Sequence, residues 1–380
     1  MDGNILMILQ SLSPSYGGIE SVGTQISGEL RKRGYKVYCA FLYEDRNDKK
    51  NAETFENIVK IDVWQQGHDK VKLLKFIVDN DISIIVNQFH EIRLSWPLQN
   101  YIKKRSCVKW INTVHIDPES YTRVNEFNNG NLSRGLGGKI SYFIYKHYIW
   151  YLRKKAYRHS DATILLAKSF IASYLKYLRT KNSNRLYFIN NPVREFNQIP
   201  EKEKKENLII SVGRLQILQK RTDKILNFWS IFKSGEASGE WNLEIVGDGA
   251  DLGVLQETAK TLNLTDCVFS GHTCNPESYY NRAKIILMTS DYEGWGLVLV
   301  EAMSYGCVPV VMNNFSSLRE IVDDGINGII VANDDYNAMT EGIKRISADF
   351  DRYSQEAIKK SQKYKAKNII EQWEALLEKV

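Results

Sequence analysis

Two glutamates stand eight positions apart in DYEGWGLVLVEAMSYGCVPVV, a largely apolar segment that runs from 291 to 311. Glu293 lies near its polar start, and Glu301 is the only charged residue between Gly294 and Met312. A buried carboxylate is costly unless it is paired or well hydrogen-bonded. Glu301 therefore needs a partner, either a basic side chain of a neighbouring element or a pair of ligand hydroxyls such as those of a ribose.

Two basic residues of the segment SVGRLQILQKRTD, at 211–223, have the chemistry to bind a diphosphate. Arg214 offers a planar fork of donors and Lys220 a compact charge, and both stabilise phosphate oxygens. An arginine and a lysine six positions apart in a loop are also common as solvated surface charges, so this segment alone leaves both interpretations open.

Glycines stand beside both segments. Gly294 and Gly296 precede a helix expected at 297–306, where they allow a ligand to approach the backbone closely. The free amides at the start of such a helix favour a phosphate. A third junction, VGDGADLGVLQ at 246–256, carries glycines that we interpret either as a tight turn or as a nucleotide contact.

The elements that must position these residues follow from the hydrophobic pattern. Short apolar runs without polar alternation are typical of parallel strands covered on both faces. Amphipathic stretches lie between them, and this alternation predicts doubly wound α/β sheets. The expected strands are 4–9, 36–42, 82–87, 107–114, 161–167 and 185–190, then 208–213, 241–247, 267–271, 284–290, 307–312 and 328–333.

The polar segment NNPVREFNQIPEKEKKEN, at 190–207, is typical of an interdomain linker. We therefore predict a first Rossmann-like domain at 1–190, a linker at 191–206 and a second Rossmann-like domain at 207–380. The carboxyl ends of the strands in such domains border a ligand cleft. The last segment, helical from about Tyr353, either closes the second domain or crosses back to the first.

The net charge of +6 is unevenly distributed, because residues 101–190 hold 17 basic and 4 acidic residues. Such an excess attracts phospholipid, a lipid pyrophosphate or nucleic acid, although a solvated basic surface would also explain it. No nucleic-acid-recognition motif is present, so we expect no nucleic-acid partner.

The cysteines and the start of the chain indicate a cytoplasmic protein. None of the five cysteines forms a C-x-x-C pair, which favours reduced thiols over disulfides or a zinc site. The start lacks the basic flank of a signal peptide, and no apolar run approaches the roughly 20 residues needed to cross a bilayer. The cysteines are Cys39, Cys107, Cys267, Cys274 and Cys307.

The pattern EGWGLVLVE, at 293–301, resembles the E-x7-E signature of the retaining family-four glycosyltransferases. Similar segments follow one another in the family's order along nearly the whole chain. They are GGIE (17–20), NTVHID (112–117), NNPV (190–193), GRLQILQK (213–220), VGDG (246–249) and DDGINGIIV (323–331). The resemblance implies the GT-B fold, in which two Rossmann-like domains face a central cleft, and a bacterial surface-glycan enzyme.

The resemblance also implies roles for the charged residues. Arg214 and Lys220 match the basic pair that holds the donor diphosphate and stabilises the leaving nucleoside diphosphate. Glu301 matches the glutamate that bonds the ribose hydroxyls, and Glu293 the one that contacts the transferred sugar. His115 matches a histidine that faces the sugar and acceptor from the first domain. The catalytic set is thus expected to be Glu293, His115, Arg214 and Lys220.

Backbone contacts to the donor are implied at five further positions. Gly296, Leu297 and Val298 match the turn on the phosphate side. Gly17 and Gly18 match the loop of the first domain that approaches the donor phosphates.

Two departures from the family pattern affect these expectations. Arg221 follows Lys220 where glycine is usual, which would alter the diphosphate loop. The segment NNFSSLRE, at 313–320, lacks glycines often found there, which weakens inference of the donor sugar.

The expected reaction moves a hexosyl or N-acetylhexosaminyl group from a nucleotide sugar, with UDP favoured over GDP, to a glycan in lipopolysaccharide or capsule biosynthesis. Fixed donors at the developing β-phosphate charge supply the main catalytic gain. No convincing D-x-D motif is present, so we expect no metal and no other cofactor. The resemblance implies retention of anomeric configuration by front-face attack.

The segment KISYFIYKHYIWYLRKKAYRHS, at 139–160, combines aromatic and basic residues. Lys139, Lys146 and Arg153 recur every seven residues, so we expect them on one helix face. Interfacial helices have this composition. The segment therefore predicts either peripheral binding to the inner face of the cell membrane, suited to a lipid-pyrophosphate-linked acceptor, or an ordinary helix with a solvated basic face.

Two other functions compete with this one. A sugar-nucleotide epimerase of related architecture would need no acceptor, and a non-catalytic GT-B subunit would support a partner. A dinucleotide oxidoreductase is disfavoured because no G-x-G-x-x-G follows the first strand.

Overall fold

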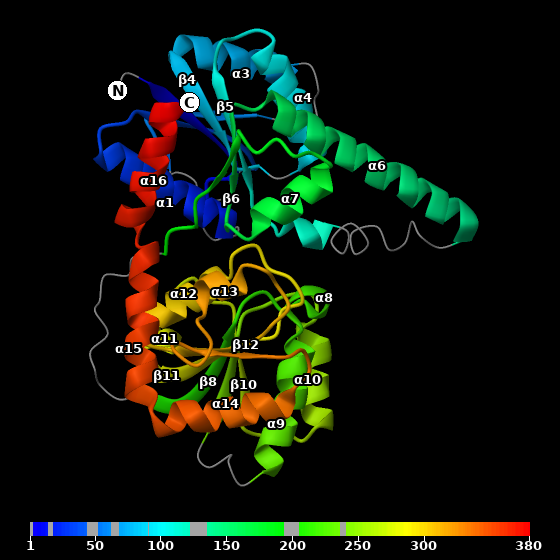
Figure 1. Ribbon diagram of the computed structural model, residues 1–380, viewed down its shortest axis with the longest axis vertical. Helices are drawn as coiled ribbons and strands as arrows, with labels where there is room; N and C mark the ends of the chain where they lie inside the picture. Colours follow the sequence, from blue (N-terminus) through cyan, green and yellow to red (C-terminus); the bar gives the residue numbers. More distant parts are fainter. Residues whose placement is uncertain are drawn as a thin grey trace. The chain divides into compact units, whose positions relative to one another are not determined.

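The computed structural model describes residues 3–13, 18–43, 52–61, 68–89, 91–121, 135–193, 205–235 and 241–380. The chain forms two compact units, one of Met1–Pro192 with Ala366–Val380 and one of Val193–Lys365 (Figure 1). Each unit is built on one parallel sheet with helices packed against it, which confirms the predicted α/β class with two Rossmann-like sheets. Most of the linker predicted at 191–206 lies outside the described residues.

The first unit holds a seven-stranded sheet in the order β3-β2-β1-β4-β5-β6-β7. Strand β1 lies inside this sheet, because it pairs with β2 on one side and β4 on the other, with Ile5 opposite both Val37 and Ile84. The strands are β1 (Asn4–Ser11), β2 (Val37–Tyr43), β3 (Ile58–Lys60), β4 (Ile82–Asn87), β5 (Lys109–Val114), β6 (Ala162–Leu165) and β7 (Leu186–Phe188).

Six α-helices accompany this sheet in the described ranges: α1 (Gly18–Lys32), α3 (His68–Asp79), α4 (Ile92–Lys103), α6 (Gly135–His159), α7 (Phe170–Leu178) and α16 (Ala366–Lys379). A short 3-10 helix, η1, covers Pro118–Ser120. The C-terminal helix α16 packs on α1, where Arg33 forms an ion pair with Glu374. Lys379 at its end lies over the ring of Tyr187 at 5.1 Å.

The second unit holds a six-stranded sheet in the order β10-β9-β8-β11-β12-β13. One cluster of its core includes Leu243, Ile285 and Val310, which lie on three different strands and are fully buried. The strands are β8 (Glu206–Val212), β9 (Asn242–Val246), β10 (Cys267–Gly271), β11 (Ala283–Met288), β12 (Val308–Met312) and β13 (Ile329–Val331).

Eight α-helices are described in this unit: α8 (Ile217–Lys220), α9 (Thr222–Ser234), α10 (Leu252–Thr261), α11 (Glu277–Arg282), α12 (Leu297–Ser304), α13 (Leu318–Ile321), α14 (Tyr336–Ala348) and α15 (Phe350–Ser361). The helical segment expected from about Tyr353 is interrupted, because a 3-10 turn at Gln362–Tyr364 is followed by extended backbone at Lys365. The interruption separates α15 from α16.

The strand order places a topological switch point in each sheet. In the second unit the order reverses between β8 and β11, which are neighbours although they are far apart in sequence. Ligands of open α/β sheets bind outside the carboxyl ends of the strands at such a point. The segment with Arg214 follows β8, and the segment with Glu293 follows β11.

In the described part of the chain, no helix combines the length and the hydropathy needed to cross a membrane.

Candidate functional site

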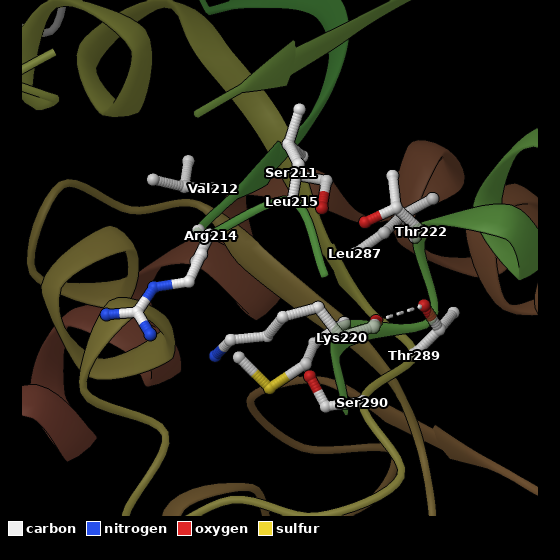
Figure 2. Close-up of a pocket in the computed structure, with 11 residues that line it drawn as sticks. Ser211, Val212, Arg214, Leu215, Lys220, Thr222, Leu287, Thr289 and Ser290 are labelled. Carbon is white, nitrogen blue, oxygen red and sulfur yellow. Dashed lines mark hydrogen bonds between the residues drawn. The ribbon is translucent and has the colours of Figure 1, made fainter. Parts of the chain in front are cut away.

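A small pocket lies at the carboxyl ends of β8 and β11 (Figure 2). Its lining combines the end of β8, the loop that follows, the start of α9 and the end of β11. The lining residues are Ser211, Val212, Gly213, Arg214, Leu215, Lys220, Thr222, Leu287, Met288, Thr289 and Ser290. The switch point of the second sheet is therefore also where its basic pair lies.

The structure joins two residues whose roles the sequence treats separately. The amine of Lys220 lies 2.6 Å from Oε1 of Glu293, whose side chain is 9% exposed. The backbone holds them together, because the amide of Asp291 donates to the carbonyl of Gln219 at 2.8 Å. Glu293, which is expected to contact the transferred sugar, thus orients Lys220, which is expected to contact the diphosphate.

The side chain of Thr289 clamps the end of α8 to the end of β11. Its hydroxyl donates to the carbonyls of Lys220 at 3.2 Å and of Arg221 at 2.8 Å (Figure 2 draws the first contact). The sequence does not indicate these hydrogen bonds, because a hydroxyl and carbonyls that are about 70 positions apart in the chain leave no local pattern.

Arg214 differs from Lys220 in its environment. Figure 2 shows its guanidinium and the Lys220 amine pointing to the same side of the loop. Arg214 is exposed, and within the described ranges it makes no ion pair. Its charge is therefore available to an anionic ligand, whereas that of Lys220 is balanced by Glu293.

The glycines of VGDG have a packing role, which favours the tight-turn interpretation over nucleotide contact. A Cβ atom on Gly247 would lie 1.8 Å from the carbonyl oxygen of Gly213, and one on Gly249 would lie 2.2 Å from that of Leu215. The two loops are also hydrogen-bonded, since the amide of Leu215 donates to the carbonyl of Asp248 at 2.9 Å. The loop after β9 thus supports the loop that carries Arg214.

Arg221, which stands where the family usually has glycine, adopts the left-handed conformation that glycine favours, with φ +51°. Its guanidinium contacts Asp223 at 2.9 Å and Asp291 at 3.1 Å. The hydrogen bond to Asp223 is the largest cause of the raised pKa of Arg221, and burial opposes it. These contacts offset the backbone cost, so the diphosphate loop keeps a glycine-like turn.

Glu301 has a partner that the sequence does not indicate. The hydroxyl of Tyr280, in α11, donates to its Oε2 at 3.1 Å. Burial, and then the charge of Glu301, raises the pKa of Tyr280 well above its usual value. The tyrosine was missed because ESYYNRA, at 277–283, carries no signal beyond an ordinary short helix.

The turn before α12 matches its expected form. Gly296 caps the helix with φ +79°, a conformation that side chains rarely adopt. Leu297 and Val298 open the helix, and the amide of Leu299 donates to the Gly296 carbonyl at 2.9 Å. The amides of the first residues of a helix have no intrahelical acceptor, so this terminus suits an anion.

The remaining predicted site residues belong to the first unit. His115 follows β5 and lines a cavity of about 280 Å³ together with Asn87, Asn112, Tyr121 and Arg153. Gly18 is the first residue of α1, and a Cβ atom there would meet nothing within 4 Å. Gly17 lies outside the described residues.

The prediction that Arg153 shares an outward basic helix face with Lys139 and Lys146 is wrong. The Arg153 guanidinium stacks on the ring of Tyr121 at 3.6 Å and donates to the hydroxyl of Tyr177 at 3.1 Å. It therefore points into the unit and lines the cavity instead of joining a solvated face with Lys146. The side chain of Lys139 lies outside those described.

Within the described ranges, no group of three or more histidine, cysteine, aspartate or glutamate side chains is placed to hold a metal ion.

Comparison with known proteins assigns the family. Residues 193–365, which are the second compact unit, match the family described as glycosyl transferases group 1. The second unit belongs to this family, and the chain is a glycosyltransferase that uses a nucleotide-sugar donor.

Individual relatives span much of the chain. An uncharacterized glycosyltransferase of Haemophilus influenzae is 26% identical over 377 residues, covering 96% of this chain and 97% of its own. The lipopolysaccharide 1,6-galactosyltransferase of Salmonella typhimurium is 23% identical, covering 82% and 81%. A Campylobacter jejuni N-acetylgalactosaminyltransferase, whose name specifies a diphospho-undecaprenol acceptor, is 30% identical, covering 43% and 42%.

The fold has a full-length counterpart among solved structures. The Anabaena protein HepE, crystallised with UDP and glucose, superposes with a TM-score of 0.76 over 100% of both chains at 15% identity. At this identity the likeness shows the fold, and the two parallel sheets are those of a GT-B protein.

Proposed function

We propose that the chain transfers a hexosyl or N-acetylhexosaminyl group from a UDP-sugar to a lipid-linked glycan, with retention of configuration, in surface-polysaccharide biosynthesis. The observation that carries the proposal is the Lys220–Glu293 pair beside the exposed Arg214, at the switch point of the second sheet. The UDP in the HepE complex and the acceptor named for the Campylobacter relative support the finer choices of donor and acceptor.

The two bases act on the leaving group. Negative charge grows on the β-phosphate as the bond to the sugar breaks, and fixed donors at that charge lower the barrier. Arg214 supplies a bidentate fork, while Lys220 is held in one orientation by Glu293. The amides of Leu297 and Val298, after Gly296, add two more donors. These groups would serve without a metal.

The two glutamates position the donor. Glu293 keeps one oxygen on Lys220 and offers the other to hydroxyls of the transferred sugar. Glu301 binds the ribose hydroxyls while Tyr280 holds its Oε2. The roles toward the donor and acceptor that the family resemblance gives to Gly17, Gly18 and His115 stay predictions.

Nucleotide binding tests the donor site first. The melting temperature is measured with UDP, GDP or NAD for the wild type, Glu301→Ala, Glu301→Gln and the control Glu257→Ala, whose residue is exposed on α10. A ligand at 100 times its dissociation constant adds about 2.7 kcal/mol to the stability of the folded state. We expect a UDP shift in the wild type and the control that is lost in Glu301→Ala.

In the Glu301→Gln variant the amide oxygen can still accept the hydrogen bond from Tyr280. A loss of the UDP shift in this variant would therefore reflect nucleotide binding and not folding. A folded wild type without any nucleotide shift would indicate a non-catalytic subunit. Conversion of a UDP-sugar without an acceptor would indicate an epimerase.

Product analysis tests the chemistry. With UDP-sugars and a polyprenyl-diphosphate-linked saccharide, NMR of the first product should show the donor's anomeric configuration, and EDTA should leave the rate unchanged. An inverted product, or activity that EDTA abolishes and a divalent cation restores, would contradict the proposed mechanism.

A further inference from the structure

One face of α6 carries large apolar side chains that the rest of the described chain leaves exposed. Phe143 and Ile144 are each 62% exposed. At 3.6 residues per turn, positions three and four apart share a face, so these residues form one continuous stripe. The α6 stripe consists of Ile140, Phe143, Ile144, Tyr148 and Tyr151.

The stripe is separate from the face that anchors α6 in the first unit. Ile149, Leu152 and Ala156 lie on the opposite side of the helix and are buried. The helix packs there against α4 and α7, and the indole of Trp150 donates to the carbonyl of Tyr177 at 2.8 Å. Figure 1 shows the early turns of α6 extending beyond the other labelled helices of that unit. Within the described residues, the stripe therefore lies outside the packed core.

The charges on α6 are of one sign. Between 135 and 159 the sequence contains no aspartate or glutamate. Lys154, Lys155 and Arg158 continue the outward face after the last residue of the stripe, and the Lys155 amine lies 5.5 Å from the ring centre of Tyr151. The same face thus passes from apolar to basic along its length.

We propose that the outward face of α6 docks in the surface of an anionic phospholipid bilayer, with the helix lying in the plane of the interface. Aliphatic and aromatic side chains enter the headgroup boundary, and flanking bases meet lipid phosphates. A second copy of the same face is a poorer occupant because it would bring like charges together without any carboxylate. A nucleic acid would leave Ile140 and Ile144 uncovered. This inference does not depend on the donor or the reaction.

Vesicle sedimentation tests the proposal with the full-length chain. Vesicles of phosphatidylcholine and phosphatidylglycerol should bind the protein at least about tenfold more tightly than phosphatidylcholine alone, because roughly 1 kcal/mol is expected per base near an anionic surface. Binding should weaken as salt rises, since screening shortens the range of these charges.

Matched variants identify the surface. Phe143→Glu/Ile144→Glu should lower binding to the mixed vesicles at least about tenfold, because charge at these positions opposes insertion. Val78→Glu, at an apolar residue of α3 that is 65% exposed, should leave it unchanged. Lys154→Gln/Lys155→Gln/Arg158→Gln should remove the preference for phosphatidylglycerol. Unchanged melting temperatures would show that the variants are folded.

Three results would overturn the proposal: no vesicle binding by the wild type, equal binding by the double variant, or equal loss in Val78→Glu. Sedimentation velocity resolves the competing occupant. A wild-type dimer that Phe143→Glu/Ile144→Glu dissociates, without vesicle binding, would make the stripe an interface between copies and the proposal wrong.

Discussion

Arg214 and Lys220 have similar charges but different surroundings. Arg214 is exposed, while Lys220 is mostly buried and lies 2.6 Å from the buried carboxylate of Glu293. Removing one partner of a buried charged pair leaves the other partner buried without its hydrogen bond, and this loss lowers the free energy of unfolding. Substitution of Arg214 should therefore affect catalysis alone, whereas substitution of Lys220 should affect both catalysis and stability.

We expect Arg214→Met to lower kcat/KM about 10²–10³-fold, as loss of a donor to developing charge does, while the free energy of unfolding changes by less than about 0.5 kcal/mol. Lys220→Met should lower kcat/KM comparably and also destabilise the protein by about 1–3 kcal/mol, because Glu293 loses its partner. Initial rates and urea denaturation measure both effects. Equal stability of the two variants would mean that the ion pair does not support the fold.

At the level of elements, the donor site depends on two loops that touch through backbone atoms. The turn after β8 carries Arg214, and the turn after β9 lies against it at Gly247 and Gly249. The contact leaves no room for a side chain, so these glycines position the site without reaching a ligand.

Gly247→Ala should destabilise the protein by more than about 1 kcal/mol, because the native conformation excludes a Cβ atom there, and should weaken UDP binding. Gly253→Ala in α10 is the control, since nothing lies within 4 Å of its Cβ position. It should be neutral or stabilising by up to about 1 kcal/mol, as alanine is the better helix former. Urea denaturation and UDP titration compare them. Equal behaviour of the two variants would refute the supporting role of the loop after β9.

On the scale of the whole molecule, the cysteines are free thiols that differ in access. Cys107 and Cys274 are exposed, whereas Cys39 and Cys307 are buried. Burial, and then the charge of Asp266, raises the pKa of Cys267 to about 12. Since the thiolate is the reactive form, the exposure and the pKa of each thiol together rank the reactivity of the five cysteines.

Alkylation with iodoacetamide at neutral pH should therefore modify Cys107 and Cys274 first, with Cys267 modified only slowly until denaturant is added. Because the folded pKa of Cys267 lies above its ordinary 9.0, the stability linked to its thiol is complete below pH 9 and lost as pH rises toward 12. Peptide mass spectrometry over time measures the order. Early modification of Cys267 would show that its thiol is more accessible than the structure indicates.

Much of this architecture is readable from local pattern. Unbroken apolar runs predict the parallel strands, and the spacing of Glu293 and Glu301 indicates the family before any contact is known. These features depend on residues within one turn or one strand. The break after Tyr364 was missed because KYKAKN, at 363–368, contains neither glycine nor proline to signal an end to the helix.

The sequence by itself therefore determined the α/β class, the order of the elements, and the donor-binding candidates. Only the tertiary structure decided that Lys220 contacts Glu293, 73 positions away, and that Tyr280 holds Glu301. It also decided that Arg153 turns inward while the α6 stripe faces out. The physical reason is that a strand or a helix turn follows from neighbouring residues, whereas a side chain's partner depends on which elements the sheet brings together.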